Sequence, residues 1–193
     1  MKKLIICIMM VLTIFPAVAQ DLPSGGEIHL SSAQRGVRTS TDVIAIALPA
    51  SALIGTLCLQ DWKGLVQGVE SAAVTAAATL ILKYSIKERR PDFSDTHSFP
   101  SGHTAVSFAS AAYLQRRYGW KFGAPAYALS CFVAWGRCYS KKHHWYDVLA
   151  GAAIGAGASY IFTRPWARQH ELQIAPTADP ESQSIGLYTS FTF

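Results

Sequence analysis

Five apolar segments, almost free of charged residues inside, constrain what this chain can fold into more than any other feature. Each is rich in Ala, Leu, Ile, Val and Gly, and none alternates apolar and polar residues as a half-buried β-strand does. We therefore expect an all-α fold, a bundle of about five to six helices. The five segments cover residues 42–60, 64–86, 103–117, 122–138 and 147–163.

The lengths of these segments leave open whether the bundle spans a membrane. The first two approach the roughly 20 residues that cross a bilayer, whereas the last three have about 15. A buried helical core in a soluble domain is the alternative. The positions of the basic residues favour a bundle in the membrane. If the mature N-terminus is periplasmic, the connections 60–63 and 116–122 and the segment after 163 lie in the cytoplasm. These stretches contain Lys and Arg, as the cytoplasmic loops of membrane proteins usually do.

The two ends of the chain differ from its middle. Met1-Lys2-Lys3, the apolar run 4–15 and the small residues 17–19 have the pattern of a cleavable export signal, and an uncleaved first membrane helix fits them too. The stretch from Ser184 to Phe193 alternates like a strand of an outer-membrane barrel, but one strand cannot close a barrel. The expected divisions are 1–19, signal peptide or first membrane helix; 20–168, a helical-bundle domain; and 169–193, polar tail.

Charged residues are few and unevenly placed. Only 15% of the residues are charged and the formal net charge is +5, against roughly 25% charged in ordinary soluble domains. No block of Lys and Arg is interleaved with aromatic residues, so we expect no nucleic-acid partner. The basic residues instead stand at the ends of the apolar segments and beside three short motifs.

The first motif places two cations around the end of the second apolar segment. Lys83 lies near that end, Arg90 follows seven residues later, and Pro91 ends the stretch. An Arg side chain offers a two-pronged donor and Lys a point charge, a pair that suits one phosphate group. Charged side chains that only extend to the membrane surface would give the same sequence pattern as a phosphate site. We interpret residues 87–89 as side chains of that kind.

The second motif, Pro100-Ser101-Gly102-His103, immediately precedes the third apolar helix. Gly102 lets the backbone approach an anion, and the helix N-terminus presents unbonded N–H groups and the positive end of its dipole. Ser101 can add a hydroxyl donor. His103, in the same turn, is placed to protonate a leaving oxygen, although a single His at such a turn is more often structural.

The third motif begins at Arg137 and places Asp147 four residues after His143. At that spacing on a helix or its first turn, the carboxylate can reach the imidazole. It would fix the tautomer, leave the other ring nitrogen unblocked for attack on an electrophile, and stabilise the imidazolium that develops. A surface His paired with an Asp of a helix first turn has the same pattern.

The order and spacing of the three motifs resemble the signature of the type 2 phosphatidic acid phosphatase superfamily. The sequence reads K-x6-R-P, then P-S-G-H, then R-x5-H-x3-D, and the resemblance covers about residues 83–151. This superfamily includes membrane lipid phosphatases, bacterial non-specific acid phosphatases and vanadium haloperoxidases.

The resemblance implies a role for each motif residue. His143 would be the nucleophile that forms a phosphohistidine, Asp147 its partner and His103 the general acid. The resemblance also implies a reaction without metal or cofactor. The residues expected to hold the phosphate are Lys83, Arg90, Ser101, Gly102 and Arg137.

Two departures from the family pattern concern the third motif. Gly136 stands where relatives usually have Ser, which removes one hydroxyl contact with phosphate. Lys141 replaces a common Gly and is followed by Lys142, and we hypothesise that these cations contact a second anionic group, such as a diphosphate or a sugar phosphate of lipid A.

The sequence thus predicts a phosphatase that hydrolyses a membrane lipid phosphomonoester or diphosphate. We expect it in a bacterial inner membrane, with its active site facing the periplasm and with a phosphorylated lipid as its partner. A soluble periplasmic acid phosphatase with the same site is the main alternative. A vanadate-dependent haloperoxidase, which the short chain disfavours, and a non-catalytic lipid-binding protein are further alternatives.

Overall fold

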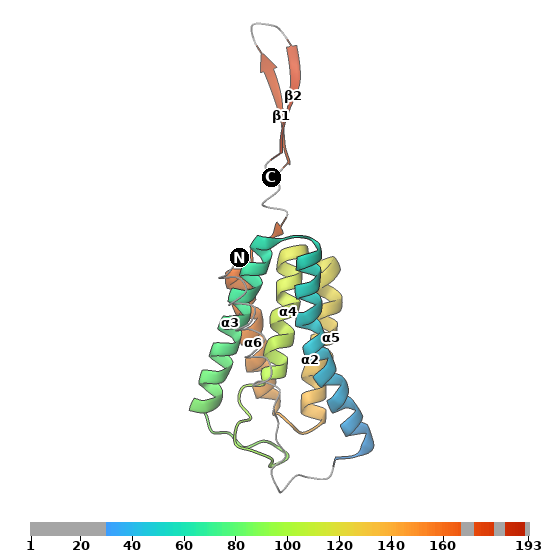
Figure 1. Ribbon diagram of the computed structural model, residues 1–193, viewed down its shortest axis with the longest axis vertical. Coiled ribbons are helices and arrows are strands. Elements are labelled where there is room, and N and C mark those ends of the chain that lie inside the picture. The colour runs from blue at the N-terminus through green and yellow to red at the C-terminus, as the bar shows by residue number, and fades with distance from the viewer. Residues whose placement is uncertain (1–29, 167–171, 180–183, 192–193) are drawn as a thin grey trace.

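The computed structural model describes residues 30–166, 172–179 and 184–191. Each of the five apolar segments corresponds to a helix of the described residues. Figure 1 shows these helices side by side in one bundle, which confirms the all-α fold. The predicted export signal, 1–19, lies outside the described residues. The helices are α2 (Ser32–Cys58), α3 (Trp62–Ser85), α4 (Gly102–Tyr118), α5 (Trp120–Tyr139) and α6 (Trp145–Phe162).

Helix α2 begins well before the apolar segment that predicted it. Ser31 and Gln34 form a capping box, in which each side chain bonds the backbone of the other, at 3.2 and 3.0 Å. The Gln34 side chain also donates to the Tyr139 carbonyl at 3.0 Å, which ties the start of α2 to the end of α5. The polar stretch before residue 42 is therefore partly helical, and it extends α2 along α5.

Helix α4 is the centre of the bundle and contacts each of the four other helices that the structure describes. Small side chains such as Ala105 and Ala109 are buried along it. Two glycines of α6, Gly151 and Gly155, lie against the α4 backbone so closely that a Cβ atom at either position would collide with it. Close approach of these two helices joins the second motif, at the start of α4, to the third motif, at the start of α6.

Large apolar side chains cover the outside of the bundle. They are exposed on α2, α3, α5 and α6, for example Ile54, Ile81, Trp135 and Ile161, of which Ile161 is 76% exposed. Helices α2 and α3 are long and apolar enough to span a membrane. An apolar surface of this extent suits contact with lipid better than contact with water.

Hydrogen bonds link neighbouring helices inside the bundle. Ser71 on α3 meets Ser159 on α6 at 2.7 Å, and Ser130 on α5 donates to the carbonyl of Ser107 on α4 at 2.9 Å. Small residues and hydroxyls between helices, with large apolar residues outside, are typical of helix packing in membranes.

An ion pair closes the end of the bundle opposite the motifs. Arg117 is buried and donates to Asp61 at 2.6 Å through Nε, and it also donates to the Arg164 carbonyl at 2.9 Å. Asp61 in turn caps α3 by accepting from the Gly64 amide at 2.9 Å. Arg117 therefore helps to hold the bundle together. Because Asp61 neutralises its charge, Arg117 adds little to the positive charge of the loops at this end.

The polar tail contains paired strands. Strands β1 (Leu172–Asp179) and β2 (Ser184–Phe191) form an antiparallel hairpin in which Leu172 lies opposite Phe191. The alternation noted from Ser184 onward is thus a strand, and its partner comes from the tail itself.

The packing of α6 on α4 predicts a contrast between two glycines of α6. Gly155→Ala should lower the stability of the protein in detergent by about 1–3 kcal/mol, because its Cβ meets α4 backbone atoms. Gly157→Ala is the matched control, since a Cβ there has open space and alanine favours the helix by up to about 1 kcal/mol. Thermal unfolding of both variants checks this, and equal midpoints would contradict the packing described.

Candidate active site

The three motifs lie together at one end of the bundle, the lower end in Figure 1. This end holds the last turns of α3 and α5, the first turns of α4 and α6, and the loops 86–101 and 140–144. The Ser101 amide donates to the Asp147 carbonyl at 3.0 Å, and Arg90 donates to the Lys142 carbonyl at 3.4 Å. The first and second motifs are thus each bonded to the third.

His143 and Asp147 face each other in a buried setting. His143 is 3% exposed, and its Nδ1 lies 3.6 Å from the Oδ2 of the fully buried Asp147. The same Oδ2 accepts the Ser98 hydroxyl and, at 2.8 Å, the amide of His144. Because Nδ1 is the nitrogen turned toward the carboxylate, Nε2 is the nitrogen that a substrate could meet.

The surroundings of His143 keep its imidazole neutral. Burial, together with the positive charges of Arg90, Arg137 and Lys83, lowers the pKa of His143 to about 3 against the opposing effect of Asp147. A neutral imidazole retains the lone pair that a nucleophile needs. The same cations that lower this pKa are near enough to attract an anion to His143.

Two of these cations, Lys83 and Arg90, are held by acceptors close to them in the sequence. Lys83 Nζ donates to the His97 carbonyl at 2.9 Å, and Arg90 Nε lies 2.8 Å from the Asp95 carboxylate. Both acceptors lie on the loop 86–101, and the bond from Lys83 to His97 brings this loop back to the end of α3. The loop therefore orients the two cations of the first motif before any anion arrives.

The second motif leaves the N-terminus of α4 without a side-chain cap. Ser101 is the N-cap residue and is fully buried, but its hydroxyl meets Thr104 Oγ1 at 3.0 Å and makes no cap hydrogen bond. The first amides of a helix are suited to bind an anion. Gly102, the first residue of α4, adds no side chain that would cover them.

His103 and Arg137 meet at a carboxylate that sequence reasoning missed. Asp42 Oδ1 on α2 lies 3.0 Å from His103 Nε2 and 2.6 Å from an Arg137 terminal nitrogen. Asp42 belongs to no motif of the sequence. The signal that could have revealed it is a lone carboxylate in an apolar helix, since such residues usually face the interior and have a function.

Lys142 has a structural partner. Its Nζ lies 2.7 Å from Asp92 Oδ2, and the two side chains are 1% and 2% exposed. The hypothesis that Lys142 contacts a second anionic group is therefore wrong, because its ammonium group is buried and already paired with Asp92. Lys141 is exposed, and for it the hypothesis stays a prediction.

Gly136 permits close contact between α5 and α2. A Cβ at Gly136 would collide with the Thr41 methyl group and lie 3.0 Å from Val37 Cγ1. The serine that relatives usually carry there would not fit beside Thr41. The departure from the family pattern thus allows α2 to lie against the site.

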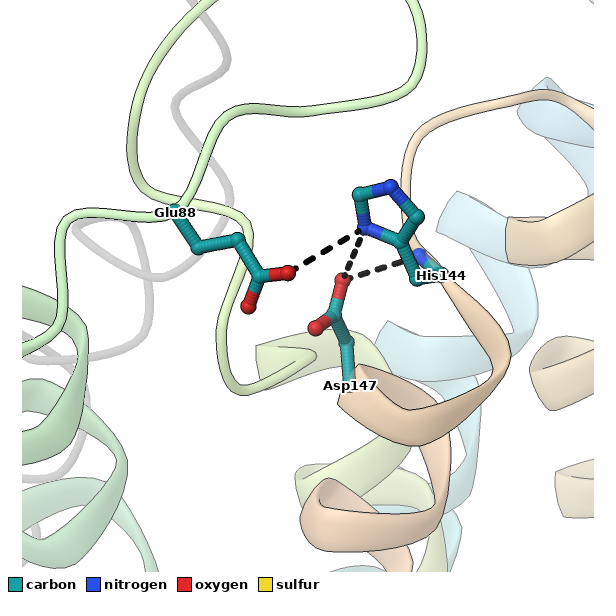
Figure 2. Close-up of side chains that lie close together, drawn as sticks. All are labelled: Glu88, His144 and Asp147. Carbon is teal, nitrogen blue, oxygen red and sulfur yellow. Dashed lines mark hydrogen bonds and ion pairs between the residues drawn. The ribbon is translucent and has the colours of Figure 1, made fainter.

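Glu88, interpreted from sequence as a residue at the membrane surface, forms a cluster with His144 and Asp147. Figure 2 shows His144 Nδ1 between the two carboxylates, 3.4 Å from Asp147 and 3.7 Å from Glu88. Tyr146 donates its hydroxyl to Glu88 and stacks its ring on His144, with centroids 5.0 Å apart. Glu88, His144 and Asp147 each offer one ligand atom, and because these atoms all lie within 4.8 Å of one another they could hold a metal ion. The expectation of a metal-free reaction stays a prediction.

Comparison with known proteins agrees with this fold and these motifs. Residues 64–171, more than half of the chain, match the PAP2 superfamily. The chain therefore belongs to this superfamily.

Two curated relatives act on lipid A. A lipid A 1-phosphatase of Porphyromonas gingivalis is 38% identical over 118 residues, which are 55% of this chain and 26% of that protein. A lipid A 4'-phosphatase of Helicobacter pylori is 28% identical over 123 residues, 57% of this chain and 62% of that protein. The matched part is thus about a quarter of the first relative and less than two thirds of the second.

A solved structure has the same fold. The crystal structure of a transmembrane PAP2-type phosphatidylglycerolphosphate phosphatase from Bacillus subtilis superposes with a TM-score of 0.56 at 19% identity. The superposition covers 84% of this chain and 94% of that one. At this identity the likeness concerns the fold.

The buried Lys142–Asp92 pair predicts opposite behaviour for two neighbouring lysines. Lys142→Met should lower the free energy of unfolding by about 3–5 kcal/mol, because it leaves the Asp92 carboxylate buried without its partner. Lys141→Met removes the same charge from an exposed position and should change it by about 0.5 kcal/mol or less. Thermal unfolding in detergent compares them, and equal stability of the two variants would contradict the role given to Lys142.

Proposed function

We propose that this chain is a membrane-embedded phosphatase that removes a phosphate group from a lipid through a phosphohistidine on His143. The observation that carries the proposal is the buried His143–Asp147 pair beside Arg90, Arg137 and Lys83. A neutral imidazole among three cations is suited to attack the phosphorus atom of a bound phosphate ester.

The cations bind and polarise the phosphate. Phosphoryl transfer spreads negative charge over the equatorial oxygens, so catalysis depends largely on positioning and charge stabilisation. Lys83, Arg90 and Arg137 supply the positive charge, and the amides at the start of α4 with the Ser101 hydroxyl supply hydrogen bonds.

Two displacements then complete the reaction. His143 Nε2 forms a bond to phosphorus as the bond from phosphorus to the leaving oxygen breaks, and His103 gives that oxygen a proton. Asp147 stabilises the positive charge that develops on the His143 ring. A water molecule then attacks phosphorus and returns a proton to His103, which releases inorganic phosphate and restores neutral His143.

The surface of the bundle supports a lipid as the substrate. Large apolar side chains cover four helices, and the site lies at the ends of these helices, where the headgroup of a lipid would lie. The lipid A phosphatases among the relatives agree with this class of substrate. Lys63, Lys121 and Arg164 lie toward the opposite end of the bundle, which favours a periplasmic orientation of the site.

The decisive test is phosphate release by the protein purified in detergent. A panel of phosphatidate, phosphatidylglycerol phosphate, undecaprenyl diphosphate and lipid A should contain at least one substrate, and EDTA should leave turnover unchanged. His143→Ala should lower kcat by about 1000-fold or more, because no other group can replace the nucleophile.

His97→Ala is the matched control, since only the backbone carbonyl of His97 bonds Lys83 and its ring packs on Tyr84. It should retain most of the activity. Release of phosphate from no lipid of the panel, or full activity in His143→Ala, would overturn the proposal.

A further inference from the structure

Asp42 joins three helices at the site through one oxygen atom. Its Oδ1 lies 3.0 Å from His103 Nε2 on α4 and 2.6 Å from Arg137 on α5. Among these side chains, Arg137 is fully buried, His103 is 10% exposed and Asp42 is 41% exposed. The carboxylate thus reaches from the rim of the site toward two side chains inside it.

Two features of the sequence place Asp42 there. The capping box at Ser31 begins α2 early enough for Asp42 to lie inside the helix, and Gln34 ties this part of α2 to the end of α5. Gly136 then lets Thr41, the neighbour of Asp42, pack directly against α5. Figure 1 shows these first turns of α2 at the end of the bundle where the motif loops lie.

A carboxylate at this position changes the chemistry of His103. An opposite charge within hydrogen-bond distance favours the protonated imidazole and fixes the orientation of the ring. A general acid must hold a proton when the substrate binds. Arg137, the other charged group at this oxygen, has the opposite effect on His103, and its charge is offset by the same carboxylate.

We propose that Asp42 is a positioning residue that keeps His103 protonated and oriented toward the leaving oxygen. This inference rests on the proposed function and adds a residue to it. In the substrate-free site His103 Nε2 lies 3.0 Å from Asp42 Oδ1, so a proton on this nitrogen can bond the carboxylate. When the phosphorus–oxygen bond breaks, His103 gives a proton to the leaving oxygen, and the attacking water later returns one.

The role predicts that the effect of Asp42 depends on the leaving group. An alcohol leaves as an unstable alkoxide unless it is protonated, whereas a nitrophenol leaves readily as its anion. Loss of a phosphate-binding or purely structural residue would slow both substrates equally. The ratio of kcat/KM for an alkyl and a nitrophenyl phosphate therefore separates these roles.

The experiment compares dioctanoyl phosphatidate with a nitrophenyl phosphate that carries an octyl chain, both in detergent. Asp42→Asn should lower kcat/KM for phosphatidate by about 10- to 100-fold and for the nitrophenyl ester by less than about threefold. Asp42→Glu should restore part of the loss on phosphatidate. Glu70→Gln, the same chemical change at an exposed position of α3, should leave both rates unchanged.

The possible outcomes are distinct. Equal losses on both esters would overturn the inference, because they indicate a role in folding or phosphate binding. A gain on both would also overturn it, because Asp42 would then merely compete with phosphate for Arg137. If the unsubstituted protein cleaves neither these esters nor any lipid of the panel, the proposed function itself fails.

Discussion

The arrangement of the site depends on the hydrogen bonds that Asp147 accepts. One carboxylate oxygen accepts the Ser98 hydroxyl and the His144 amide and faces the His143 imidazole. The Asp147 carbonyl accepts the Ser101 amide. A single residue in the first turn of α6 therefore ties together the loop before α4, the start of α4 and the turn that carries His143. Since this carboxylate is fully buried, the bonds that it accepts are also what makes its burial tolerable.

The packing of small residues holds this arrangement in place. Gly151 and Gly155 bring α6 against α4, so the starts of these two helices meet at the same end of the bundle. Gly136 has the corresponding effect for α5 and α2. In both cases a glycine lets a neighbouring helix approach closely and brings an acidic residue to the site. Asp147 lies one turn before Gly151, and Asp42 follows Thr41, the residue that packs on Gly136. Helix packing and the geometry of the site are thus the same problem in this protein.

The sequence predicted much of this because the informative signals were local. Apolar segments gave the helices, and motif spacing indicated which ends would meet. Features that depend on distant partners were missed or misinterpreted. Lys142 follows Lys141 and looks exposed, but its partner Asp92 lies far back in the chain and becomes visible only when the loops fold together. Asp42 matches no motif, and Glu88 looked like an ordinary interfacial charge until His144 and Tyr146 were placed beside it. The early start of α2 could have been found, since Ser31 and Gln34 have the spacing of a capping box.

The central claim, that His143 carries the phosphoryl group, is most directly tested by trapping the phosphorylated enzyme. A lipid labelled in its phosphate group would be mixed with the protein, the reaction stopped in denaturant at alkaline pH, and the labelled peptide mapped by mass spectrometry. The account predicts an acid-labile phosphoryl group on His143, and none on the neighbouring His144. Label on another residue, or complete turnover without any labelled protein under single-turnover conditions, would contradict it.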